Sequence, residues 1–183
     1  MAYYTQDQLS QLGFKSLGKN LKISDKASIY DYSNIEIGDN SRIDDFCVVS
    51  GNVKIGNNVH ITPMCLIAGG VEGIILEDIV TIAYGVIIFT QSDDYHGGSL
   101  TNSTIPKKYK NEKKIKVLLK RHSIVGSGSI ILPGVVLEVG VSVGAMTLVT
   151  KATDPWGIYV GIPAVKIRER GKELIKKEMK YLK

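Results

Sequence analysis

The chain has 183 residues, of which 44% are hydrophobic, 22% charged and only 7% aromatic. This length suits a single domain, and the hydrophobic share is large enough for a buried core and too large for a disordered chain. No apolar run approaches the ~18 residues that a membrane-spanning helix needs, and the first residues lack the pattern of a signal peptide. We therefore expect a cytoplasmic protein without a membrane partner.

The net charge of +5 is unevenly distributed. Residues 107–121 hold eight Lys or Arg and one Glu, and residues 166–183 hold eight Lys or Arg and three Glu. Such segments are either solvated faces or attractive surfaces for a polyanion. Neither contains a nucleic-acid-binding motif, so nucleic acid is not an expected partner.

A short helix is predicted near the start of the chain, over residues 5–12. Thr5, followed three residues later by Gln8, matches a capping box, and Gly13 is a typical helix stop. We expect residues 1–20 to form a helical cap, because a stack of repeats has open ends that must be covered.

A period of six residues runs through the middle of the chain and is clearest in residues 119–154. Each unit begins with Ile, Leu or Val, and its fifth residue is small or β-branched. Neither a helix nor a single strand produces this period. Short strands joined by tight turns do, so the pattern predicts a parallel β-helix of hexapeptide repeats over residues 21–154. The opening positions are Ile23, Ile29, Ile37, Ile43, Val49, Ile55, Ile61, Ile67, Leu76, Ile82, Ile88, Leu119, Val125, Ile131, Leu137, Val143 and Val149.

Three units make one triangular coil, so the repeats predict between five and six coils. The fifth positions include Ser33 and Val71, each of which precedes a short slip in the period. Cys47 and Cys65 are both fifth residues and are one full coil apart, so they should stack at the ~4.8 Å spacing of neighbouring strands. We expect both to be buried, reduced thiols.

Residues 89–118 interrupt the period with a polar, turn-rich segment. A long loop in a regular scaffold is usually functional or disordered. Because this one carries the consecutive residues Asp93, Asp94, Tyr95 and His96, we expect it to be functional.

The last segment, residues 155–183, is predicted to turn the chain and then form a helix. On that helix the apolar residues Leu174, Ile175, Met179 and Leu182 can share one stripe, opposite the lysines. The stripe could pack on its own chain or on a neighbouring subunit.

Three features together resemble one family. They are the repeats, the loop segments SDDYHG (92–97) and TNSTIP (101–106), and the Gly-x-Pro-Ala sequence at 161–164. These resemble the left-handed β-helix hexapeptide acyltransferases, which include galactoside, maltose and xenobiotic acetyltransferases and the N-acetyltransferases of nucleotide-linked amino sugars. The resemblance implies an all-β, left-handed parallel β-helix, a homotrimer, and acetyl-CoA in a groove between neighbouring coils.

The resemblance also implies which residues hold the co-substrate. Ser127 and Ala145 match positions that contact pantetheine, although small residues there also suit corner geometry. Thr150 and Lys151 match a pair near the nucleotide of CoA, and Arg168 matches a basic residue at a CoA phosphate. The family usually has a basic residue directly after Pro-Ala, where this chain has a valine. No metal is expected.

For the acceptor, His96 resembles a loop histidine that takes the proton, with Asp93, Asp94, Tyr95 and Asn102 as contacts of the sugar. Similar enzymes often have Ser in place of this histidine. The aspartates would then bind the sugar. The base would be His122 or His60, or an amine would attack without a base. Otherwise His60 and His122 are interpreted as surface residues at coil corners.

The main functional prediction is O-acetylation of a galactoside-like or polysaccharide-precursor sugar. The alternative is N-acetylation of a nucleotide-linked amino sugar. A metal hydratase of the γ-carbonic anhydrase type shares the fold, but it needs three histidine ligands, two of them in an H-x4-H pair. The histidines at positions 60, 96 and 122 lack that spacing, so this class is disfavoured. A purely structural solenoid does not explain the loop cluster.

Overall fold

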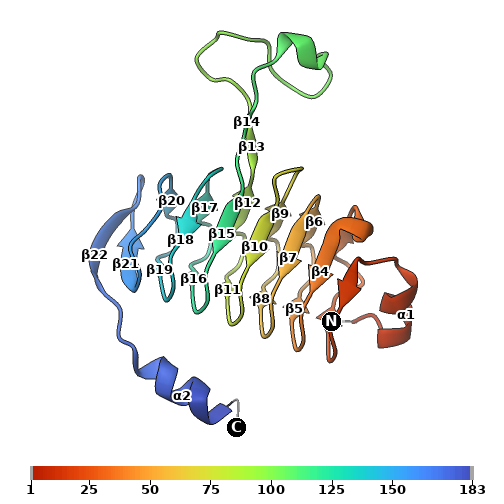
Figure 1. Ribbon diagram of the computed structural model, residues 1–183, viewed down its shortest axis with the longest axis vertical. Helices are drawn as coiled ribbons and strands as arrows, with labels where there is room; N and C mark the ends of the chain where they lie inside the picture. Colours follow the sequence, from red (N-terminus) through yellow and green to blue (C-terminus); the bar gives the residue numbers. More distant parts are fainter. Residues whose placement is uncertain (1, 182–183) are drawn as a thin grey trace.

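The computed structural model describes residues 2–181. Short strands follow one another around three parallel sheets, which form the three faces of a β-helix (Figure 1). The predicted all-β, left-handed parallel β-helix is therefore confirmed.

The strands of each face are hydrogen-bonded to the equivalent strands of the neighbouring coils. The first face contains β1 (Ser16–Leu17), β4 (Ile35–Ile37), β7 (Val53–Ile55), β10 (Ile74–Leu76), β15 (Val117–Leu119) and β18 (Val136–Leu137). The second face contains β2 (Lys22–Ile23), β5 (Arg42–Ile43), β8 (His60–Ile61), β11 (Thr81–Ile82), β16 (Ile124–Val125), β19 (Ser142–Val143) and β21 (Gly157–Val160), with antiparallel β22 (Val165–Glu169) at its edge. The third face contains β3 (Ser28–Ile29), β6 (Val48–Ser50), β9 (Leu66–Ala68), β12 (Ile87–Phe89), β17 (Ile130–Ile131) and β20 (Leu148–Val149).

The core is a stack of aliphatic side chains along the axis of the β-helix. Every predicted opening position is buried, and most pair with the opening residue of the next coil, as Ile43 pairs with Ile61 and Ile61 with Ile82. Burying one such side chain contributes about 1.5–3 kcal/mol before the loss of chain entropy is subtracted. The repeat itself therefore supplies most of the stability of the fold.

Two of the predicted fifth positions are wrong. Ser33 and Val71 are exposed, and Ile35 and Ile74 occupy the inward positions instead. In both places extra residues bulge out at a corner, so the inward site moves along the chain. In addition, Leu17 on β1 begins a coil inside the segment predicted as a cap.

The N-terminal helix α1 (Gln6–Gln11) has the predicted capping box. The Thr5 hydroxyl accepts a hydrogen bond from the Gln8 backbone N–H at 3.2 Å, and the Gln8 side chain accepts one from the Thr5 backbone N–H at 2.8 Å. Leu9 is fully buried and belongs to the core cluster, so the helix covers the first coil.

The corners between faces use left-handed backbone conformations. At the first corner, between the first and second faces, Asn20, Asn40 and Asn58 have φ near +56°, a conformation that asparagine tolerates better than most residues. At the second corner, between the second and third faces, Phe46, Met64 and Met146 have φ of 55–66°. Large apolar residues pay a conformational cost there.

The long loop leaves from the third corner, between the third and first faces. Its stem is an antiparallel pair, β13 (Gln91–Ser92) and β14 (Lys113–Lys114), and a 3-10 turn, η2 (Lys107–Tyr109), lies near its tip. The loop stands well away from the β-helix (Figure 1). It is shorter than the predicted 89–118, because both ends of that range belong to strands β12 and β15.

At the other end, the hairpin of β21 and β22 closes the last coil, and helix α2 (Glu173–Tyr181) runs back along the body (Figure 1). Leu174 is half-buried, whereas Ile175 and Met179 are exposed, and Leu182 lies outside the described residues. Only part of the predicted apolar stripe therefore faces the β-helix. Among residues 2–181 no helix is long and apolar enough to cross a membrane.

Cys47 and Cys65 are free and buried, as predicted. They directly precede the paired strands β6 and β9 and are one coil apart. A hydrogen bond with the neighbouring thiol, together with burial, raises the pKa of Cys47. A thiol with a raised pKa is a poor nucleophile.

Candidate active site

Ser127 and Ala145 lie at the second corner, on consecutive coils. The Met146 backbone N–H donates to the Ser127 carbonyl at 2.8 Å, and that of Gly128 donates to the Tyr84 carbonyl at 2.8 Å. A Cβ on Gly126 would lie 2.5 Å from the Ala145 backbone nitrogen. This glycine is therefore needed for coil stacking, whatever else the corner does.

An exposed apolar row follows the second corner along the axis. It consists of side chains that are 58–72% exposed: Phe46, Met64, Tyr84, Met146 and Ile162. Ser127 and Ala145 lie within this row. Aligned apolar side chains beside small residues suit either an extended, partly apolar molecule or another protein surface.

The other predicted co-substrate residues lie at the same end of the β-helix but on different corners. Thr150 and Lys151 are exposed at the third corner, directly after β20, whereas Ala145 precedes β20. Arg168 is exposed on β22, opposite Ile158. All of these residues belong to the last coils of the β-helix.

The loop brings its predicted acceptor-site residues together. The Asp94 carboxylate accepts hydrogen bonds from the His96 backbone N–H at 2.8 Å and from the Ser99 hydroxyl at 3.2 Å. The His96 N–H bond is the main reason why the pKa of Asp94 lies below its usual value. Asp93 accepts from the Asn102 backbone N–H at 3.4 Å, and the Asn102 side-chain oxygen accepts from the Thr104 N–H and hydroxyl.

The His96 imidazole is not oriented by these carboxylates. Within residues 2–181 it has no hydrogen-bond partner, because Asp94 bonds the backbone two residues ahead, as aspartates do in tight turns. Tyr95 is 90% exposed. The sequence places Asp94 and His96 close together, but it does not show that the Asp94 carboxylate is already bonded to the backbone of the turn.

A cavity of 430 Å³ adjoins the cluster and is also lined by Asn111, Glu112 and Lys113. Hydrogen bonds from Lys110 and Lys114 lower the pKa of Glu112 to about 2. Because the stem carries the loop away from the body (Figure 1), we infer that the loop and the second corner of one copy do not form a joint site.

His60 lies on strand β8 of the second face and not at a corner. Its Nε2 is 2.9 Å from Asp44 Oδ2, and its side chain is 38% exposed. Asp44 is buried and also accepts hydrogen bonds from Arg42 Nε at 2.6 Å and from the Tyr3 hydroxyl at 3.3 Å. Burial alone would raise the pKa of Asp44, but the Arg42 and His60 contacts outweigh it and hold that pKa below its usual value.

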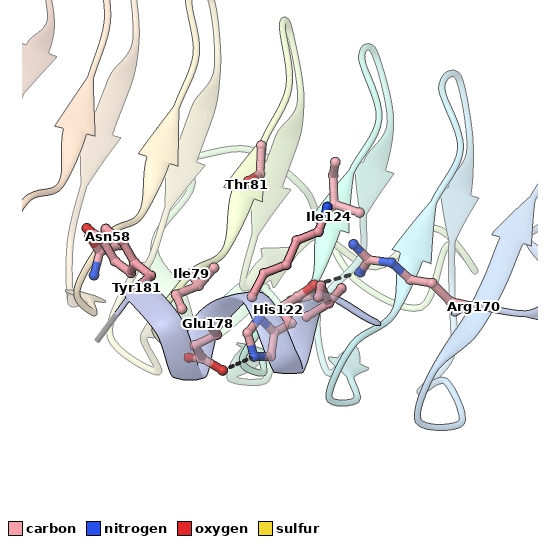
Figure 2. Close-up of a pocket in the computed structure, with 11 residues that line it drawn as sticks. Asn58, Ile79, Thr81, His122, Ile124, Arg170, Glu178 and Tyr181 are labelled. Atoms are coloured by element: carbon pink, nitrogen blue, oxygen red, sulfur yellow. Dashed lines mark hydrogen bonds and ion pairs between the residues drawn. The ribbon is translucent and has the colours of Figure 1, made fainter. Parts of the chain in front are cut away.

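His122 is at the first corner but is buried, so its interpretation as a surface residue is wrong. Helix α2 covers it, and its Nε2 is 2.9 Å from Glu178 Oε2. Arg121 bridges Asp78 and Glu178. Figure 2 shows this contact at the edge of a 460 Å³ cavity between α2 and the β-helix, with Ile79 and Ile124 on the inner wall. The ion pair gives His122 a structural role in docking the helix.

Known proteins resemble the chain over nearly its whole length. The family described as bacterial transferase hexapeptide (six repeats) matches residues 34–69. The dTDP-4-amino-4,6-dideoxy-D-glucose acyltransferase of Escherichia coli is 41% identical over 180 residues, which are 97% of this chain and 94% of that protein. AntD, an N-acyltransferase from Bacillus cereus solved with dTDP and 3-hydroxybutyryl-CoA, is 46% identical with a TM-score of 0.97, covering 98% of this chain and 96% of that one.

A maltose O-acetyltransferase from Clostridium difficile 630 is 24% identical with a TM-score of 0.57, covering 91% of this chain and 75% of that one, and it shares the fold. The full-length relatives are acyltransferases, and AntD is solved with a CoA thioester. Fold, repeats and relatives agree, and this chain belongs to the hexapeptide-repeat acyltransferases.

Proposed function

We propose that the protein transfers an acyl group from a CoA thioester to the amino group of a nucleotide-linked sugar. The observation that carries this proposal is the 46% identity, over nearly the full length of both chains, to an N-acyltransferase solved with dTDP and 3-hydroxybutyryl-CoA. The same protein has been solved with dTDP-4-amino-4,6-dideoxyglucose and coenzyme A. This favours N-acylation, the alternative from the sequence, over O-acetylation of a galactoside.

The last coils offer a surface for the acyl-CoA. The pantetheine arm is long and partly apolar, which suits the second corner beside Ser127 and Ala145. The phosphates are polyanionic, which suits the exposed cations Lys151 and Arg168 with Thr150 nearby. We propose acetyl-CoA as the first donor to test, with 3-hydroxybutyryl-CoA beside it.

The acceptor contacts are proposed to come from the loop of a neighbouring copy in a homotrimer. Asp93, Asp94, Tyr95 and Asn102 are placed by the loop turns, and carboxylates can bind both an amine and sugar hydroxyls. The exposed row at the second corner gives the neighbouring copy a surface to approach. His96 stays the predicted base within the loop, as a proposal from the family resemblance.

The test is a CoA-release assay with a matched set of acceptors. We expect rapid release with a dTDP-linked 4-amino-4,6-dideoxy sugar. The same nucleotide sugar with a hydroxyl at position 4 should give little release, and so should a free galactoside. Release with the galactoside and none with the amino sugar would overturn the proposal and restore O-acetylation.

A further inference from the structure

We propose that His60, held by Asp44, takes the proton from the acceptor amine, and that the open cavity beside His60 receives the acceptor. This inference rests on the proposed N-acylation. It moves the proton acceptor from His96 in the loop to the body of the β-helix and keeps the other loop residues in the roles proposed above.

His60 is held in one orientation by a buried carboxylate. The 2.9 Å contact between His60 Nε2 and Asp44 Oδ2 fixes the ring, and Asp44 is itself held by Arg42 and Tyr3. Within residues 2–181 the other ring nitrogen, Nδ1, has no hydrogen-bond partner, and the side chain is 38% exposed. An accessible imidazole nitrogen backed by a buried carboxylate is the arrangement that proton transfer requires.

An open cavity lies beside His60. It has a volume of 580 Å³ and contains no carboxylate among the residues that line it: Asn20, Lys22, Asn40, Ser41, Arg42, Asn58, Val59 and His60. Lys22, Arg42 and His60 are register partners on β2, β5 and β8. Lys22 and Arg42 are cationic, and like charges directly opposite one another are unfavourable without an anion. Asp44 contacts Arg42 and His60 from the side, and the open side of the cavity suits a diphosphate.

His60 lies near the second corner, where the acyl donor is proposed to bind. His60 pairs with Thr81, and Thr81 pairs with Ile124, which lies two residues before Gly126 at the second corner. Two strand spacings separate His60 from Ile124, which is about 10 Å. A pantetheine arm that runs along the second corner from Ala145 past Ser127 would carry its thioester towards His60.

The chemistry balances without a further reagent. Neutral His60 accepts one proton from the ammonium form of the acceptor and leaves a free amine. The amine nitrogen attacks the thioester carbonyl carbon, the C–S bond breaks, and the second N–H proton goes to the departing thiolate, which gives CoA. The protonated imidazole then releases its proton to solvent. Charged groups that face His60 are Asp44, Arg42 and Lys22, with Tyr3 behind Asp44.

The three histidines differ in burial and in hydrogen-bond partners. His122 is buried under α2 in an ion pair, and the His96 imidazole has no partner within the described chain. His60 alone among them combines a carboxylate partner with partial exposure beside a cationic cavity. The geometry therefore favours His60 as the body-side base.

The kinetic test compares His60→Ala with His96→Ala in the full-length enzyme. We expect His60→Ala to lower kcat by ~10²–10⁴ with little change in the acyl-CoA KM. Its rate should recover partly with added imidazole. His60→Gln keeps much of the side chain's volume, but its amide cannot accept the proton. This variant should therefore lower kcat by the same factor. Near-normal kcat in His60→Ala, or the whole loss falling on His96→Ala, would overturn the proposal.

A binding test keeps this inference separate from the proposed function. In wild-type protein the imidazole C–H proton signals of His60, assigned with His60→Gln, should shift when the nucleotide-linked amino sugar is added, even if no turnover occurs. Unchanged His60 chemical shifts would exclude His60 from the acceptor site. An enzyme that shifts this signal but acylates only a hydroxyl would contradict the proposed function alone.

Lys22 offers a matched test of the anion contact. Lys22→Ala should raise the KM for the nucleotide-linked sugar about tenfold, because a charge-assisted contact to a phosphate is lost. Lys54→Ala removes an exposed lysine from the first face, which pairs with Glu36, and should leave that KM unchanged. Equal KM values for the two variants would remove the cavity from the acceptor site.

Discussion

The carboxylate of Glu178, on the C-terminal helix, pairs with the imidazole of His122 at a corner of the β-helix, with 2.9 Å between Oε2 and Nε2. Arg121 contacts the same carboxylate. Burial acts to raise the pKa of Glu178, but the Arg121 hydrogen bond and the charge of His122 outweigh it, so that the pKa lies below the ordinary 4.5.

A carboxylate with a lowered pKa in the folded state stabilises the docked helix above its unfolded pKa, and this stability is lost as the pH falls through the folded pKa. We therefore expect α2 to detach in acid, at a pH below that at which an ordinary glutamate titrates. The fluorescence of Trp156, the single tryptophan, reports this because Lys172 lies 5.5 Å from its ring centre. Glu178→Gln should abolish the acid transition, and Glu173→Gln, an exposed change on the same helix, should leave it in place.

Gly126→Ala should destabilise the β-helix by about 1–3 kcal/mol, because the new Cβ would press on backbone and not on a movable side chain. Gly171→Ala is the matched control. Its Cβ would meet only the end of the Glu173 side chain, so its effect should stay within about 0.5 kcal/mol. Urea unfolding of the two variants measures the difference. Equal midpoints would show that the coils separate more easily at this corner than the packing indicates.

Lys151→Ala should raise the acyl-CoA KM about tenfold with a smaller change in kcat, because a phosphate contact far from the thioester binds ground and transition states alike. Lys19→Ala changes an exposed lysine at the opposite end of the β-helix and should leave this KM unaltered. Initial rates over a range of acyl-CoA concentrations separate the two effects. A fall in kcat alone would place Lys151 near the reacting groups.

Replacing residues 92–113 by an Asn-Gly turn should leave the β-helix folded and remove activity. The stem pairs Gln91 with Lys114, and the Ile115 N–H donates to the Thr90 carbonyl at 2.9 Å, so the shortened chain can close. The melting temperature and CoA release check the two halves of this prediction. Full activity without the loop would exclude it from the site.

The same variant tests assembly. We expect trimers in light scattering and, if the loop completes a neighbour's site, recovery of activity when the loop-shortened chain is co-expressed with Ala145→Trp. In mixed trimers an intact corner then meets an intact loop from another copy. A monomer that is active, or a mixture that stays inactive, would contradict a site shared between copies.

The sequence predicted the core well because one short period repeats and each aliphatic position has the same neighbours above and below. It failed at Ser33 and Val71, because the extra residues lie before the inward fifth position and not after it, so that Ile35 and Ile74 are the buried residues there. The buried state of His122 depends on Glu178, 56 residues away, and no local pattern encodes that contact. The His60–Asp44 pair could have been predicted from the sequence, since Arg42 and His60 occupy equivalent positions of consecutive coils.

The candidate site was predictable in composition and less so in arrangement. Asp94 and His96 lie together, as their places in the loop predict, but the turn joins them through the His96 backbone and not through the imidazole. The co-substrate residues were identified by resemblance, and their distribution over two corners and β22 required the coils to be stacked first.

The loop also has a consequence for how this fold can change over evolutionary time. Most hydrogen bonds between coils join residues about one turn apart, such as the Thr147 amide and the Ser129 hydroxyl, which are 18 residues apart. Across the loop, the Arg121 amide bonds to Glu77, which is 44 residues away. By the logarithmic cost of closing a longer segment, that excursion costs only about 0.8 kcal/mol. Its length and sequence can therefore vary at little cost to the stability of the scaffold, so the acceptor contacts proposed for the loop can change while the stacked coils remain the same.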